Sequence, residues 1–302
     1  YEEWRFGPSQ RASLPISFLE AWREARLLPV ADLDEGFIRP VYEGQIMVSY
    51  VQAGLVCMLI ADHYPRGLEK ILAVNRAGGD NDAAIRDGVG VEPEALDELL
   101  EAYLTENYAG PAEQIEAFRA HLSAAAEHAA VEDWTQSAAE AERAVAIYPG
   151  YVEPGSPYVT AVRARVQLDD KSAARTHAEA YFHAGGRDPE VLKFLAEQLE
   201  GAGALEVYRA RALTVPLTMS ARQDFADALL AAGDAAEAAR EYQVVLELEP
   251  HDLAAAHFQL ASALAASGDA AAAREQVLLA LEIAPRYSEA LALLMELHST
   301  YE

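Results

Sequence analysis

A repeat near the C-terminus constrains the fold more than any other feature of this chain. Segments 221–250 and 255–285 align on their Gly-Asp pairs, and the offset from Gly233 to Gly268 is 35 residues. The same offset separates the prolines that follow, Pro250 and Pro285. Alanines recur where two helices would cross, glycine relieves a turn, and proline stops a helix. Such units bury a core only by stacking on their neighbours, so the pattern predicts a stack of antiparallel helix pairs.

The repeat resembles the tetratricopeptide repeat (TPR), a pair of antiparallel helices of about 34 residues. The residues that match its pattern are Ala226, Gly233, Ala238, Tyr242 and Pro250, then Ala261, Gly268, Ala273, Ala280 and Pro285. Weaker units precede them at 121–149, 158–186 and 190–216, and we expect the last of these to have a shortened second helix. The resemblance implies an all-α chain, with a solenoid of about five helix pairs over 111–302 and a C-terminal capping helix at 288–301.

A TPR solenoid presents a concave face that suits a peptide or a helix. By the family's pattern, the inward positions of the first helices include Gln223, Asp227 and Leu230 in one repeat, and Phe258 and Ser262 in the next. Simple packing is the alternative role for Phe258. The Lys/Asn/Arg set with which related repeats hold a C-terminal carboxylate is absent, so we do not expect that kind of ligand.

The first 110 residues lack the repeat and predict a small helical bundle. Their most apolar stretch carries apolar or small residues at helical spacing, and other apolar residues fill the opposite side, which predicts a helix buried nearly all round. The first set is Met47, Tyr50, Gly54, Cys57, Met58 and Ala61; the second is Leu55, Leu59 and Ile60. The uninterrupted apolar run, 53–61, is too short to cross a membrane, so no membrane insertion is expected. Residues 109–111, Ala-Gly-Pro, predict the domain boundary.

The order of helices over residues 14–108 resembles the C-terminal part of the peptidase MA-like domain, which belongs to the gluzincin zinc metallopeptidases. The residues that carry this resemblance are Tyr50, Gln52, Ala53, Tyr64, Leu68, Ile71, Leu72, Ala84, Ile85, Gly90 and Val91. It implies that Tyr50 is placed where related enzymes stabilise the oxyanion of a tetrahedral intermediate. A packing role for Tyr50 remains the alternative.

The zinc ligands of such an enzyme are missing. Gluzincins bind zinc through HExxH and a later glutamate, and none of the eight histidines here is followed by glutamate. We therefore expect no metal and no cofactor in this chain; zinc would belong to a longer parent whose motif lies upstream of residue 1. Loss of the catalytic half by truncation and loss of the motif in an ancestor are both open. Cys57, the single cysteine, is expected to be inert.

The charge balance bears on the partner. The chain has 49 acidic and 23 basic residues, a net charge of −26, which disfavours nucleic acids and anionic membrane surfaces. The predicted function is a scaffold that binds a protein or peptide on its TPR concave face. The alternative is a fragment of an active gluzincin, and a third hypothesis makes the N-terminal bundle a simple cap. The oligomeric state and the bacterial compartment, periplasm or cytoplasm, stay open.

Overall fold

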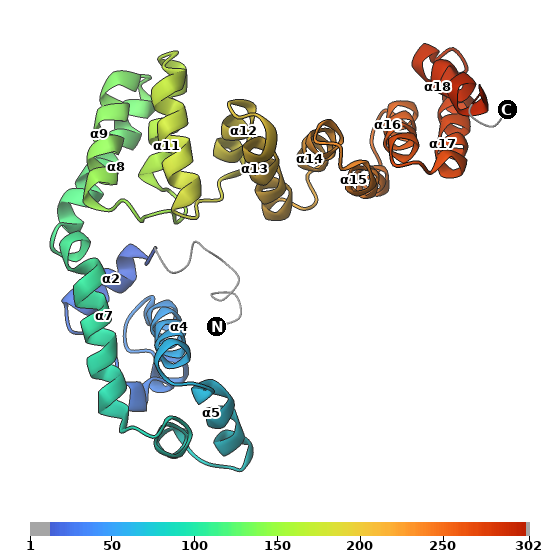
Figure 1. Cartoon of the computed structure of the whole chain (residues 1–302). Coiled ribbons are helices and arrows are strands. Elements are labelled where there is room, and N and C mark those ends of the chain that lie inside the picture. Colours follow the sequence, from blue (N-terminus) through green and yellow to red (C-terminus); the bar gives the residue numbers. More distant parts are fainter. Residues whose placement is uncertain (1–12, 300–302) are drawn as a thin grey trace. The chain divides into compact units, whose positions relative to one another are not determined.

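The structure is a computed structural model that describes residues 13–299, and every regular element in that range is helical. The prediction of an all-α chain is confirmed. The chain divides into two compact units, Tyr1–Gly186 and Arg187–Glu302, called unit 1 and unit 2 below. Figure 1 shows the helices of each unit in the order of the chain.

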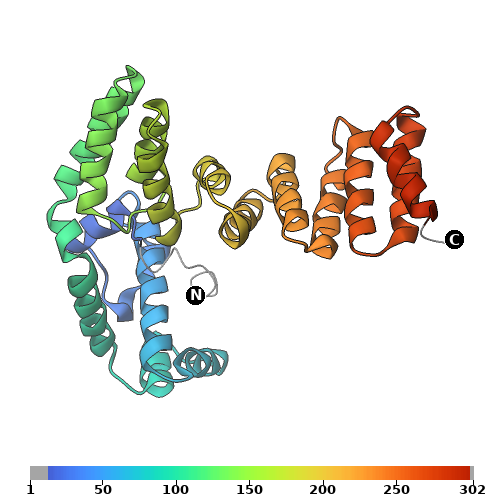
Figure 2. The same ribbon diagram turned by 45° about the horizontal axis from the view of Figure 1, so that its top comes forward.

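Unit 1 combines the N-terminal bundle with the first two helix pairs. Its elements are α2 (Ile16–Arg23), η1 (Val30–Asp32), α3 (Glu35–Ile38), α4 (Gln45–His63), α5 (Gly67–Arg76), α6 (Asn81–Ala83), η2 (Ala84–Val89), α7 (Pro93–Glu113), α8 (Ile115–Ala130), α9 (Trp134–Ile147), α10 (Pro157–Gln167) and α11 (Lys171–His183). The bundle is built around α4, which contacts α2, α3, α5 and α7. In Figures 1 and 2, α7 runs along one side of α4.

Helix α4 is buried on one side only, which corrects the expectation of a helix buried nearly all round. Its core face includes Val48, Leu55 and Leu59, each no more than 4% exposed. Met47 and Tyr50, which the sequence pattern placed among the apolar or small residues at helical spacing, are 61% and 52% exposed. The pattern could not choose a side, because both sides of the helix are apolar.

The expected boundary at 109–111 lies inside a helix. Helix α7 continues through Gly110 and Pro111 to Glu113. Pro111 removes only one backbone hydrogen bond, near the helix end. Tyr108 and Ala112 on this last stretch belong to the same core as Phe118 of α8. The bundle and the first helix pair therefore share one hydrophobic core, and the compact units divide after Gly186 instead.

The helix pairs match the predicted count within the described residues. After α8/α9 and α10/α11 in unit 1, unit 2 holds α12 (Pro189–Glu197), α13 (Gly201–Thr214), α14 (Met219–Ala231), α15 (Ala235–Glu247), α16 (Leu253–Ala266), α17 (Ala270–Ile283) and the closing α18 (Ser288–Ser299). The irregular unit at 190–216 differs from expectation. Its first helix, α12, is short at 9 residues, whereas α13 has 14.

The two Gly-Asp turns share one backbone geometry. In the Gly-Asp turns, Gly233 and Gly268 have φ of +86° and +88°, and the next N–H bonds back to the carbonyl five residues earlier, Asp234 N to Leu229 O at 2.9 Å. This is a Schellman motif. The following aspartate begins the second helix, and the Asp269 side chain accepts from Ala272 N at 3.0 Å.

Alanine fills the crossing points between paired helices. Ala226, Ala238, Ala261, Ala273 and Ala280 are all 0% exposed, as the repeat pattern predicts. Because alanine has no side chain beyond Cβ, the helix axes approach closely there.

Candidate functional site

The predicted binding residues of unit 2 lie on the first helices of two pairs. Gln223, Asp227 and Leu230 follow one face of α14, while Phe258 and Ser262 are one turn apart on α16. Asp227 is exposed and the other four are half-buried. We call these five residues the first-helix face.

Four of these residues also take part in packing or hydrogen bonds, Asp227 among them. The Phe258 ring lies 5.0 Å from the Tyr287 ring, measured between centroids. The Ser262 hydroxyl donates to the Phe258 carbonyl at 2.9 Å. Leu230 packs against the core that includes Phe225 and Tyr242. The packing alternative for Phe258 is therefore part of its role.

Asp227 belongs to an acidic group that the sequence pattern did not reveal. The carboxylate of Asp227 accepts a hydrogen bond from the Tyr242 hydroxyl of α15. Burial raises the pKa of Tyr208 on α13, and the negative charges of Asp224, Glu197 and Asp227 raise that pKa further. Carboxylates from α12 and α14 thus act electrostatically on one tyrosine. We call Glu197, Asp224 and Asp227 the acidic group.

A buried arginine holds part of this group in place. Arg211 of α13 is 3% exposed; it donates to Asp224 Oδ2 at 2.7 Å and to the Pro189 carbonyl at 3.1 Å. The ion pair links α13 to α14, and the backbone contact reaches the start of α12. Arg211 forms its ion pair with Asp224. It does not pair with Glu197 or Asp227.

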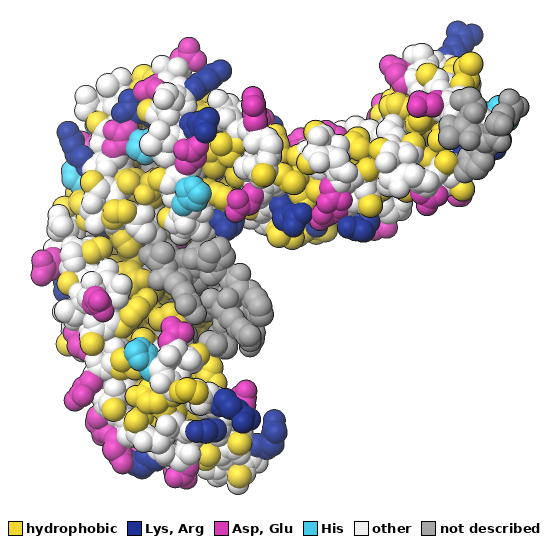
Figure 3. Space-filling model, in the orientation of Figure 1, with side chains coloured by type: hydrophobic (Ala, Val, Ile, Leu, Met, Phe, Trp, Pro, Cys, Tyr) yellow, Lys and Arg dark blue, Asp and Glu magenta, His cyan; other side chains and the backbone are white. Residues whose placement is uncertain are grey.

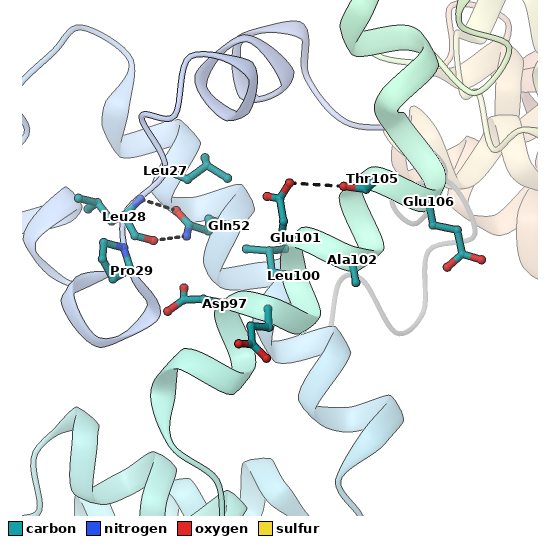
Figure 4. Close-up of a pocket in the computed structure, with 11 residues that line it drawn as sticks. Leu27, Leu28, Pro29, Gln52, Asp97, Leu100, Glu101, Ala102, Thr105 and Glu106 are labelled. Carbon is teal, nitrogen blue, oxygen red and sulfur yellow. Dashed lines mark hydrogen bonds between the residues drawn. The ribbon is translucent and has the colours of Figure 1, made fainter.

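Unit 1 contains a pocket of about 820 Å³ between the loop after α2 and helix α7 (Figure 4). The loop is held by side chains, because it has no strand or helix partner for its backbone groups. Gln52 of α4 is 1% exposed. Its amide donates to the Leu28 carbonyl at 2.5 Å and accepts from the Leu28 N–H at 3.3 Å. The Asp97 carboxylate accepts from the Val30 N–H at 2.9 Å.

The pocket lining is acidic and apolar. It includes four carboxylates and no basic side chain; the carboxylates are Asp97, Glu98, Glu101 and Glu106. Burial raises the pKa of Asp97, while the hydrogen bond from Val30 opposes that shift. Glu101 is engaged by the Trp22 indole N–H at 2.8 Å. Glu101 also accepts a hydrogen bond from the Thr105 hydroxyl at 3.4 Å. The pocket therefore favours a positive charge.

The N-terminal residues singled out for chemistry lie apart from this pocket lining. Tyr50 is on the outward side of α4, and Cys57 is half-buried on the same helix, where burial raises the pKa of its thiol. Within residues 13–299, no group of three or more His, Cys, Asp or Glu is arranged to hold a metal ion. The oxyanion role of Tyr50 stays a prediction, as does the peptidase-like resemblance.

Helix α4 is also the one helix of the described residues that is long and apolar enough to cross a membrane. Its apolar stretch has a mean hydropathy of 1.5, and half of that stretch is buried within the protein. The buried half is the face that forms the core of unit 1. A core helix passes the same test of length and composition.

The chain is similar to solved TPR structures at low identity and low TM-score. No family model matches the sequence, and no curated protein matches it. Among solved structures, YrrB, "a TPR protein with an unusual peptide-binding site", is 20% identical, with 57% of this chain and 89% of that chain covered and a TM-score of 0.45. MamA is 12% identical, with 57% of this chain and 96% of MamA covered and a TM-score of 0.42. A thermophilic TPR protein of Thermus thermophilus is 18% identical, with 60% and 97% covered and a TM-score of 0.31. At these identities and TM-scores, nothing about the partners of this chain follows from them.

Proposed function

We propose that this chain is a protein-interaction scaffold that binds a peptide or protein segment on the first-helix face of unit 2. The observation that carries the proposal is the exposed Asp227 carboxylate on α14, which the Tyr242 hydroxyl of α15 holds in place by a hydrogen bond. Because Arg211 pairs with Asp224 alone, Glu197 and Asp227 are available to a cation. The half-buried Leu230 and Phe258 add apolar surface on neighbouring first helices.

The preferred segment follows from this chemistry. A lysine or arginine of the ligand would meet the acidic group, and an apolar side chain would lie near Leu230 or Phe258. Charge-assisted hydrogen bonds to carboxylates contribute more than neutral ones. The ligand class is therefore a short basic segment with at least one large apolar residue.

The test is selection from a displayed random-peptide library on the full chain. We expect enrichment of peptides that combine Lys or Arg with a large apolar residue. For a selected peptide, Asp227→Asn should raise the dissociation constant roughly tenfold, as expected for the loss of one charged partner. Asparagine keeps the shape and an acceptor for the Tyr242 hydroxyl, so the fold should be retained. Phe258→Ala should weaken binding as well, by lost apolar contact.

The matched control is Glu275→Gln, which removes one negative charge from an exposed position of α17, a second helix. It should leave the dissociation constant unchanged. Equal affinity in the wild type and in both Asp227→Asn and Phe258→Ala would place the binding surface elsewhere. Enrichment of acidic peptides would contradict the proposed ligand class.

A further inference from the structure

We propose that the chain forms a two-fold symmetric homodimer through the outward side of α3 and α4. This surface, called the α3–α4 face, consists of Phe37, Ile38, Val41, Ile46, Met47 and Tyr50. It belongs to unit 1 and is independent of the binding function proposed for unit 2.

The exposure of this face is the first observation. Its six large apolar side chains are between 40% and 83% exposed, and Val41 is the most exposed of them. Gly36 brings α3 directly against α4, because a Cβ at this position would overlap the Ser49 hydroxyl. The two elements therefore form one continuous surface.

The area of the face matches what a dimer needs. With about 150–250 Å² for each large side chain and the exposed fractions above, the face presents on the order of 700 Å². The largest apolar patch on a typical monomer is about 300–600 Å². A standard interface buries about 800 Å² on each partner. One copy of this face against another therefore comes close to the size of a standard interface.

The charge of the face favours a second copy over a charge-steered partner. The whole chain carries a net charge of −26, so most of its surface repels another copy. The charged residues of α3, α4 and the loop between them are Glu35, Arg39, Glu43 and Asp62, a net charge of −2 over residues 35–63. Arg39 and Glu43 are exposed, and Arg39 makes a 3.9 Å ion pair with Glu35. Figure 3 shows acidic side chains spread over other parts of the visible surface.

The outward side of α4 can also accept another helix at short range. Beyond Tyr50 it presents the small, half-buried Ala53, Gly54 and Cys57. Ala53, Cys57 and Phe37 line an apolar pocket of about 250 Å³. In a two-fold interface the same patch meets itself, so an apolar side chain of one copy can enter the pocket of the other.

The test is sedimentation velocity on the full chain at concentrations from about 1 to 100 µM, a range that brackets a micromolar dissociation constant. We expect a concentration-dependent change from monomer to dimer. Val41→Asp and Met47→Asp should each raise the dimer dissociation constant at least about tenfold, because two-fold symmetry places two new carboxylates in one apolar interface. Val131→Asp, at a position 74% exposed in the α8–α9 turn, is the matched control and should leave dimerisation unchanged.

Val41 lies in a loop, so its substitution tests the interface with little risk to folding. Circular dichroism of each variant confirms that the helices are retained. A chain that stays monomeric over the whole range overturns the proposal. So does a dimer whose dissociation constant is unchanged in both Val41→Asp and Met47→Asp, or a face that binds a different protein but never a second copy.

Discussion

At the scale of single residues, the turns explain why the upstream repeats are hard to see in the sequence. The position filled by Gly233 and Gly268 has positive φ, where glycine is favoured. In unit 1 the same position is Glu132 with φ of 59° and Asp169 with φ of 57°. The Schellman hydrogen bond is kept, with Asp133 N to His128 O and Asp170 N to Arg165 O both at 2.9 Å. The turn conformation is therefore the same in both units, although glycine occupies the position only in unit 2.

Glu132→Gly should therefore stabilise the protein. A non-glycine residue in the left-handed region costs roughly 1–2 kcal/mol, which the substitution removes. Glycine also makes the unfolded chain more flexible, and this lowers the stability by roughly 0.4–1 kcal/mol. We expect a net gain of about 0.5–1 kcal/mol in the free energy of unfolding, measured by urea denaturation. Gly233→Ala is the converse change and should destabilise by a similar amount. A loss of stability in Glu132→Gly would show that the Glu132 side chain contributes more than its backbone strain costs.

At the scale of elements, an aromatic cluster in unit 1 joins the start of the N-terminal bundle to the end of α9. Tyr148, just after α9, accepts from the Leu14 N–H at 2.7 Å and donates to the Leu14 carbonyl at 3.3 Å. The rings of Phe118, Tyr148 and Tyr151 lie between 5.2 and 6.0 Å apart by centroid. The start of the bundle thus packs on the end of the first helix pair.

Tyr148→Phe should destabilise unit 1 by about 1–2 kcal/mol. The substitution keeps the ring contacts but leaves the buried Leu14 N–H without its acceptor, and an unpaired buried donor costs about 1–3 kcal/mol. The measurement is chemical denaturation followed by circular dichroism. Tyr64→Phe serves as the control, because that ring also packs on the core of unit 1 but is not fully buried. Equal stability of Tyr148→Phe and wild type would show that water replaces the lost acceptor.

The sequence predicted where the helices lie better than it predicted which of their faces are buried and which groups meet. Alanine spacing and Gly-Asp turns are local signals, so the helix pairs and the closing helix could be read directly. The outward side of α4 could not, because Met47 and Leu55 are equally apolar and only tertiary packing distinguishes them. Helix α7 runs through the Ala-Gly-Pro stretch for a related reason: burial of Tyr108 and Ala112 outweighs the local cost of Pro111. The acidic group was missed because Glu197 and Asp224 act on the same tyrosine only when the helices pack.

At the scale of the whole molecule, charge sets the response to salt. A net charge of −26 produces self-repulsion in the compact state. The ion pairs that salt would weaken include exposed ones such as Arg66–Glu69, and exposed pairs contribute little.

Salt should therefore raise the thermal stability of the chain. Between about 0.02 and 0.5 M NaCl the screening length shortens several-fold, and we expect Tm to rise by several degrees. The measurement is thermal unfolding followed by circular dichroism. Potassium chloride should give the same curve, since screening does not distinguish the two cations. A fall in Tm with added salt would show that attractive ion pairs outweigh the repulsion.

The contact between Leu14 and Tyr148 also has a consequence for the order of folding. These residues are separated by 134 positions, whereas the helix pairs of unit 2 contact mainly their neighbours along the chain. Distant contacts slow folding, because a long loop must close before they form. Unit 1 therefore has the higher contact order. During synthesis on the ribosome, its N-terminal helices cannot complete their core until Tyr148 and Tyr151 have emerged.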